Sequence, residues 1–352
     1  PDYSGYRGDD YAADLDSARG YGAVASNQSW GIVSINPNVS NWSGFNYCHP
    51  SDSNCIFNAT EFQAVLDNNP SFSATQVLGY FNEWAVDGGT AVTTAATSAT
   101  SDWITALDNF QSSGVVVFAS GNSTYESDVS VVAALPEWFS QLEEAWIVAG
   151  MVDFTGDDIS DTSTSEFTLY GNKCGTAKEY CVVVDGYELY AATYVSGSTH
   201  YYTEPVSGSS FSAPMVSGGI ALLAQAFPNH TPAQLTDRLL ASANNHWFTP
   251  EGNTTFTSHG NSITHGYHST WGHGVPDFYS ALSPITTNSN PALFYTSSTI
   301  TEGNNSDKLT FTVSDSGLSQ SSAFGDSLLE GIKGTQTYFY DAMGGGFKYD
   351  LS

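Results

Sequence analysis

The feature that most constrains the fold of this chain is a turn of small residues that runs directly into an apolar helix. The turn reads Gly-Ser-Ser-Phe-Ser-Ala-Pro over residues 208–214. Pro214 suits the first turn of a helix, where its missing N–H group is not needed. The residues that follow are apolar enough to predict a buried helix, and they include Met215, Val216, Ile220, Leu222 and Leu223.

Ser210 lies at the start of this predicted helix. Free backbone N–H groups and the helix dipole favour negative charge at that end of a helix. An acyl-transfer nucleophile needs this environment. The alternative is a serine-rich turn that only caps a core helix, so other segments must decide between the two interpretations.

Three segments, in this order along the chain, resemble motifs of the subtilisin-like serine proteases, the subtilases. An apolar strand closes on Ser29-Trp30-Gly31, similar to the segment whose backbone forms one wall of the family's primary specificity pocket. The β-branched run 115–119 predicts a strand buried on both faces of a parallel sheet, and it ends in Ser120-Gly121-Asn122. Residues 208–214 resemble the nucleophile motif Gly-Thr-Ser-x-Ala-x-Pro, with Ser209 in place of Thr.

The resemblance implies a role for each of these residues. Ser210 would be the nucleophile. Asn122 matches the Asn of the family's Ala-x-Gly-Asn element, whose amide donates a hydrogen bond to the oxyanion. The implied substrate-binding residues are Ser29, Trp30, Gly31, Ser120 and Gly121.

Each assignment has a plainer alternative. Ser29–Gly31 could be an ordinary strand end, and Asn122 could be a turn residue or a glycosylation site with Thr124. The sedolisins share a similar serine turn and suit an acidic chain, but they carry an Asp at the oxyanion position. The dipeptide Gly121-Asn122 matches the subtilases instead.

The resemblance covers about residues 15–282, the C-terminal two-thirds of a subtilase catalytic domain. It implies an α/β fold with a subtilisin-like parallel sheet and flanking helices, from which the N-terminal part is missing. We therefore expect a partial catalytic domain over residues 1–285, with a long insertion at 32–100, and a β-rich extension or linker over 286–352. The segment from Cys174 to Gly186 is most like subtilases carried on bacterial autotransporters.

Two of the three catalytic side chains expected of a subtilase have no counterpart here. The family's Asp and His motifs precede the Ser-Trp-Gly segment, but the 30 residues before Gly31 contain no histidine. Asp161 falls too late in the chain to be the triad Asp. We expect the histidines to be surface or turn residues: His49, His200, His230, His246, His259, His265, His268 and His273.

Two classes of function follow from this incomplete triad. The first is a secreted serine endopeptidase that forms an acyl-enzyme on Ser210, with the Asp and His on an upstream fragment of the same precursor. The chain starts at Pro1 without an initiator Met, as expected of a processed or excised part of a longer product. The second class is a catalytically inactive surface scaffold or binding module.

Composition limits the partners. There are 36 acidic and 8 basic residues, which gives a formal charge of −28 and a pI of about 4.1. This balance argues against nucleic acid or an anionic membrane as a partner, so we expect a polypeptide substrate and any membrane attachment only through a distant anchor. It fits a protein located outside the cell or on the bacterial outer surface.

The four cysteines form two close pairs, Cys48/Cys55 and Cys174/Cys181. Their even number and spacing predict two small-loop disulfides in an oxidising compartment, with a zinc site as the alternative. No cofactor is required for the expected chemistry. Acidic clusters offer ligands for a structural Ca²⁺, although a solvated loop is the alternative, as for Asp157, Asp158 and Asp161.

Local patterns predict further elements. A short helix is expected over 13–19, Thr60 is expected to cap a helix through Phe62 and Leu66, and 88–100 is expected to be loop. Apolar residues recur at helical spacing from Trp103 to Phe110, with the helix expected to end within 109–114, and 146–153 is a second buried strand. Thr231-Pro232 opens a helix with one apolar face. Strands are expected over 309–313 and 335–340.

Overall fold

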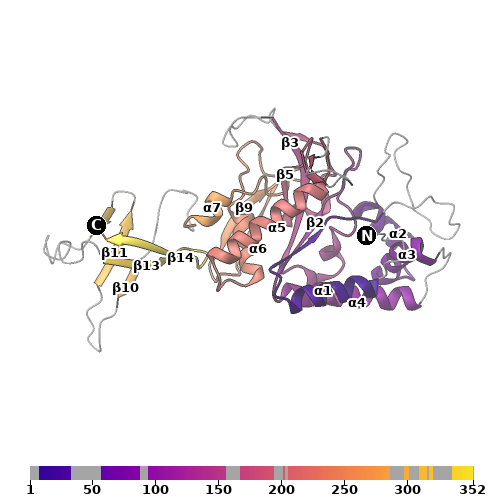
Figure 1. Cartoon of the computed structure of the whole chain (residues 1–352), viewed down its shortest axis with the longest axis horizontal. Coiled ribbons are helices and arrows are strands. Elements are labelled where there is room, and N and C mark those ends of the chain that lie inside the picture. The colour runs from indigo at the N-terminus through magenta and orange to yellow at the C-terminus, as the bar shows by residue number, and fades with distance from the viewer. Residues whose placement is uncertain are drawn as a thin grey trace.

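A parallel β-sheet forms the centre of the computed structural model (Figure 1). The structure describes residues 8–32, 57–87, 94–155, 167–193, 201–202, 205–285, 297–300, 309–314, 317–319 and 335–351. The sheet runs β1–β2–β3, and β5 pairs parallel with β3 while β4 pairs antiparallel with it. Its strands are β1 (Ala25–Gln28), β2 (Val115–Ala119), β3 (Trp146–Phe154), β4 (Phe167–Leu169) and β5 (Cys181–Asp185).

Helices cover both faces of this sheet. One face packs against α1 (Gly8–Gly20), α2 (Ala59–Asn68), α3 (Ala74–Asp87) and α4 (Thr94–Gln111). The other face packs against α5 (Ser209–Ala226), α6 (Pro232–Ala241) and α7 (Phe278–Leu282). This confirms the expected α/β fold with a parallel sheet and flanking helices.

The alternation of side chains along β2 explains the two layers. Val116 and Phe118 point into the core shared with α1–α4, where Phe118 stacks on Trp146. Val115 and Val117 point into the core shared with α5 and α6. Every residue of β2 is buried, as the continuous β-branched run predicts for a central strand.

Three local expectations were wrong. Asn58, not Thr60, caps α2, because its side chain accepts from the Glu61 N–H at 2.9 Å and the Glu61 carboxylate accepts from the Asn58 N–H. The hydroxyl of Thr60 instead donates to Asp128 at 2.7 Å. The helix α4 already begins at Thr94, inside the stretch expected to be loop, because Ala96 and Ala99 pack into the core.

The third correction concerns α5. Pro214 lies inside the helix rather than in its first turn, because the helix begins at Ser209. The helix is also buried on one side only. Val216 and Ile220 are fully buried, whereas Met215 is 42% exposed and Leu222 is 54% exposed.

Shorter elements surround the sheet. Short 3₁₀ helices among the described residues lead into β3 and β5, namely η1 (Leu135–Glu137), η2 (Ser140–Leu142) and η4 (Gly175–Tyr180). Two small hairpins pair β6 (Ala192–Thr193) with β7 (Tyr201–Tyr202) and β8 (Gly252–Phe256) with β9 (Ile263–Tyr267). Among the described residues, no helix is both long and apolar enough to cross a membrane.

The described elements after residue 286 are all strands, as expected of a β-rich extension. The first three form one antiparallel sheet and the last two form a hairpin: β10 (Ser297–Ile300), β11 (Leu309–Ser314), β12 (Gly317–Ser319), β13 (Thr335–Tyr340) and β14 (Gly346–Leu351). The turn of the hairpin, residues 341–345, docks beside α6. Whether 286–352 is a separate domain stays a prediction.

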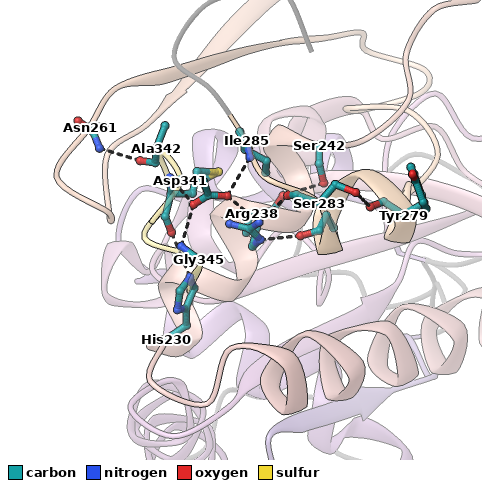
Figure 2. A network of polar contacts seen from close by, with 12 residues as sticks. His230, Arg238, Ser242, Asn261, Tyr279, Ser283, Ile285, Asp341, Ala342 and Gly345 are labelled. Carbon is teal, nitrogen blue, oxygen red and sulfur yellow. Dashed lines mark hydrogen bonds and ion pairs between the residues drawn. The ribbon is translucent and has the colours of Figure 1, made fainter. Parts of the chain in front are cut away.

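An ion pair holds this hairpin turn in place (Figure 2). The Arg238 guanidinium on α6 donates to the Asp341 carboxylate at 2.8 Å, and both side chains are almost fully buried. Asp341 also accepts the backbone N–H groups of Ile285, Met343 and Gly345. The carboxylate is therefore fully surrounded by donors, which is what a buried charge requires.

One of the two expected disulfides lies among the described residues. Cys174 is bonded to Cys181, which confirms the disulfide interpretation for this pair and excludes the zinc alternative there. The second pair, Cys48 and Cys55, lies outside the described residues. So do the acidic residues Asp157, Asp158 and Asp161, and in the described part of the chain no three His, Cys, Asp or Glu side chains are grouped to hold a metal ion.

Candidate active site

The predicted nucleophile Ser210 is the second residue of α5 and is half-buried. Gly208 precedes the helix, and its N–H donates to the carbonyl of Gly186 at 2.9 Å. The Ser210 hydroxyl donates to the Ser29 carbonyl at 3.3 Å, and the Ser29 hydroxyl donates back to the Ser210 carbonyl at 3.0 Å. The start of α5 is thus joined to the segment that follows β1.

Pro214 explains why the Ser29 hydroxyl can make its contact. In a regular helix the N–H of residue 214 would donate to the carbonyl of residue 210, but proline has no N–H. The Ser210 carbonyl is therefore left without its helical donor, and Ser29 supplies one. An interior proline usually costs stability, and here the freed carbonyl is used to join α5 to the neighbouring strand end.

Asn122 is held against the same end of α5. It follows β2, and its Oδ1 accepts from the Ser209 N–H at 2.7 Å and from the Ser209 hydroxyl at 2.8 Å. The Ser209 oxygen in turn accepts from the Gly121 N–H at 3.1 Å. Two donors on Oδ1 fix the orientation of the amide. Its NH₂ group has no hydrogen-bond partner among the described residues, and it therefore remains available as a donor.

The Ser29–Gly31 segment lies at the end of β1, next to Asn122, because β1 and β2 are adjacent parallel strands. The Trp30 indole stacks on Tyr11 of α1 with ring centres 4.9 Å apart and donates to Gln28 at 2.7 Å. Its ring is thus fixed between the helices and the sheet. A groove of about 570 Å³ runs along this strand, lined by α1 and by residues 26–31.

Ser120 and Gly121 lie beneath this surface. Ser120 is fully buried, and its hydroxyl donates to the Gly121 carbonyl at 3.3 Å. Gly121 has a φ of +119°, a region that strongly favours glycine. These two predicted substrate-binding residues therefore shape the turn that presents Asn122.

Among the described residues, none supplies a base to Ser210. Asp185 is the last residue of β5. Partial burial and the neighbouring Asp153 carboxylate raise its pKa, while a hydrogen bond from the Tyr187 N–H lowers it. The described histidines contact other parts of the fold. His49 and His200 lie outside the described residues, as does Asp161.

The expectation that all histidines are surface or turn residues was wrong for His273. It is fully buried, and its Nδ1 lies 2.9 Å from Nδ1 of His265. The Nε2 atoms of these rings face the carbonyls of Glu179 and Ala243. Burial lowers the pKa of both imidazoles, that of His273 to about 3. The pair is part of the core around β9.

Comparison with known protein families identifies the family of this chain. The model of the subtilase family matches residues 4–267. This chain belongs to the subtilase family. Subtilases are serine proteases, and the match covers the three segments that meet at the start of α5.

Individual relatives of this subtilase share little sequence with it or match only a part of it. A serotype-specific antigen of Mannheimia haemolytica is 32% identical over 135 residues, which is 38% of this chain but only 13% of that protein. Among solved structures, a prenylagaramide maturation protease shares 15% identity over 80% of this chain and 69% of its own, with a TM-score of 0.44. Fervidolysin from Fervidobacterium pennivorans shares 21% identity over 53% of this chain and 25% of its own, with a TM-score of 0.35.

The structure brings together the residues that the sequence singled out in three separate segments. Ser210, Asn122 and Ser29 lie at one edge of the sheet, at the carboxyl ends of β1 and β2. Sequence reasoning gave Ser209 no role and missed Asn172, yet both residues contact the Asn122 loop. Ser209 stands at the Thr position of the family motif, but no motif marks Asn172.

Proposed function

We propose that this chain is part of a secreted serine endopeptidase that cleaves peptide bonds through an acyl-enzyme on Ser210. The observation that carries the proposal is that Ser209, the residue next to Ser210 at the amino end of α5, holds the Asn122 amide through its backbone N–H and its hydroxyl. A helix start and a free amide donor both stabilise negative charge. In this proposal the Asn122 amide stabilises the oxyanion of the tetrahedral intermediate that forms on Ser210.

The proposed reaction follows from this geometry. The Ser210 oxygen attacks the substrate carbonyl, and the oxyanion accepts a hydrogen bond from the Asn122 NH₂ group. The peptide C–N bond then breaks, and the leaving amine takes the proton that a base removed from Ser210. Water hydrolyses the resulting ester and regenerates the hydroxyl. The Ser29–Gly31 segment would bind the substrate alongside.

The base and its orienting carboxylate would come from an upstream fragment of the same precursor, which carries the His and the Asp. Two surfaces support this part of the proposal. β1 pairs with β2 on one side, and no described strand pairs with its other edge. α5 exposes the apolar side chains of Met215 and Leu222. An unpaired strand edge and an exposed apolar helix face are features that another segment normally covers.

The proposed location is outside the cell or on the bacterial outer surface. The Cys174–Cys181 disulfide supports an oxidising compartment, and the charge of −28 suits a soluble secreted protein. The similar Mannheimia protein is described as an antigen. The resemblance to subtilases of autotransporters belongs to the same proposal.

A second candidate is a catalytically inactive scaffold. The observation that favours it is the partner of Ser210, whose hydroxyl donates to a backbone carbonyl rather than to a base. In this case the fold would be retained as a binding surface, and the upstream fragment would lack a functional base.

A fluorophosphonate probe distinguishes the two candidates. The natural preparation is treated with the probe, and intact masses are recorded under denaturing conditions. We expect one adduct on this chain together with an upstream companion fragment. Ser210→Ala should abolish the adduct, and Ser217→Ala, which alters a serine of α5 that bonds to Ala213, should keep it. A folded preparation with its companion but without an adduct would leave the scaffold.

A further inference from the structure

A single buried asparagine contacts the chain on both sides of Asn122. Asn172 follows β4 and is fully buried. Its backbone N–H donates to the carbonyl of Gly121 at 3.2 Å, and its Oδ1 accepts from the Ser123 N–H at 2.9 Å. Its Nδ2 donates to the Asp128 carbonyl at 2.8 Å. All three polar groups are thus used on the loop that presents Asn122.

The fit between Asn172 and this loop is close. A Cβ atom built on Gly121 would lie 2.4 Å from the Asn172 Oδ1, so the backbone passes directly over the amide. The two ends of the amide are also not interchangeable, since one faces an N–H donor and the other a carbonyl acceptor. Aspartate would place an oxygen against the Asp128 carbonyl, and alanine would leave both backbone groups unpaired.

Asn172 is itself fixed by the segment that follows it. The Cys174–Cys181 disulfide closes that segment onto the start of β5. The Asp128 carboxylate accepts from the Thr176 N–H at 2.7 Å and from its hydroxyl at 2.8 Å. The loop of Asn122 is therefore bonded to the segment 172–181 at two places, through Asn172 and through the contact of Asp128 with Thr176.

We propose that Asn172 is a positioning residue that acts through Asn122. It holds the turn of Gly121 and the backbone of Ser123, so that the Asn122 NH₂ group stays where the oxyanion forms. This inference rests on the proposed function. A displacement of a catalytic group by about 1 Å can cost about 10²-fold in rate. Loss of the Asn172 hydrogen bonds should therefore lower kcat, although Asn172 acts only through Asn122.

The test is a double-mutant cycle in the natural full-length protein with a peptide substrate. We expect Asn172→Ala to lower kcat about 10-fold or more with little change in KM. In an Asn122→Ala background, Asn172→Ala should change kcat by less than about 2-fold, because the group that it positions is gone. A residue with only a structural role would lower kcat by the same factor in both backgrounds, and that result would overturn the proposal.

Control variants distinguish loss of the positioning role from a loss of folding and from a failure of the proposed function. Asn244→Ala removes a buried asparagine that accepts from the His246 N–H, away from the site, and should leave kcat of the folded protein unchanged. If Asn172→Ala does not fold, Asn172→Ser is used for the cycle, with the same criteria. If Ser210→Ala and Asn122→Ala reduce activity but the Asn172 variants do not, only the positioning role fails. If Ser210→Ala leaves activity intact, the proposed function fails and this inference with it.

Discussion

The hydroxyl of Ser209 joins two parts of the site at the scale of a single residue. It accepts from the Gly121 N–H and donates to the Asn122 Oδ1, and the residue is 1% exposed. No water can replace such a contact without a cavity. The position therefore demands a hydroxyl, which is consistent with the Thr that the family motif carries there.

We predict that Ser209→Ala lowers the free energy of unfolding by about 1–3 kcal/mol, because it leaves the Gly121 N–H buried and unpaired. Ser209→Thr keeps the hydroxyl and should lie closer to the unchanged protein. Equilibrium unfolding in urea measures both. Equal urea midpoints for the Ala and Thr variants would show that the hydroxyl contributes nothing to stability.

At the scale of the elements, a buried ion pair joins α6 to the hairpin turn 341–345 (Figure 2). The Arg238 guanidinium also donates to the carbonyls of Ala281 and Ser283, and it lies 4.1 Å from the centre of the Phe227 ring. The guanidinium Nη1 has no hydrogen-bond partner within the described part of the chain. Within the described residues, Asp341 is the carboxylate that pairs with the Arg238 charge.

We predict that Asp341→Ala destabilises the fold by about 3–5 kcal/mol, because it leaves the Arg238 charge buried without a counter-charge. The double variant Arg238→Met with Asp341→Ala should be more stable than Asp341→Ala alone, since it removes the charge as well. Urea unfolding of the three proteins measures this order. A double variant that is less stable than Asp341→Ala would contradict it.

The same hairpin turn should also respond to acid. His230 contacts the Met343 carbonyl through Nε2 at 3.0 Å, and His259 lies against His230. Burial lowers the pKa of both, that of His259 to about 4, and nearby Arg238 adds to the effect while Asp341 opposes it. The neighbouring Asp237 accepts from the Ser258 N–H. Both imidazoles are therefore neutral in the folded protein at neutral pH.

The sign of the effect follows from these lowered pKa values. The contribution to stability is complete above the unfolded pKa of 6.5 and is lost as the pH falls from there towards about 4. We expect the amides of residues 341–345 to lose protection from hydrogen exchange between pH 7 and pH 4.5, after correction for intrinsic rates. His259→Phe should reduce this loss. Protection that does not change with pH would exclude the two histidines as its cause.

How far the sequence predicts these elements depends on the range of the interactions that fix them. The run 115–119 predicts β2 because its burial on both faces demands continuous apolar residues. The small-residue turn likewise predicts that a helix follows, although α5 begins earlier than the position of Pro214 indicated. In contrast, Asp341 lies 103 positions from Arg238, and no local pattern pairs them. The contact of Asn172 with Ser123 is likewise set by tertiary packing.

At the scale of the whole molecule, the sheet is covered unequally. The face towards α1–α4 is closed by a large core that includes Trp103 and Trp146, whereas α5 on the other face leaves apolar side chains exposed. In addition, no described strand pairs with the outer edge of β1. Burial is favourable by roughly 25 cal/mol per Å² of apolar surface. A second polypeptide that covers both features would gain this energy and complete the sheet.

We therefore predict that Leu222→Ser and Met215→Ser hardly change the stability of this chain alone, by less than about 0.5 kcal/mol, because both side chains already face water. They should instead reduce the amount of the proposed upstream fragment that stays with the chain in gel filtration of the natural preparation. Tyr279→Ser, at an 84% exposed position on α7, is the matched control and should retain the fragment. Equal retention in all three variants would mean that the exposed face of α5 is not where the fragment docks.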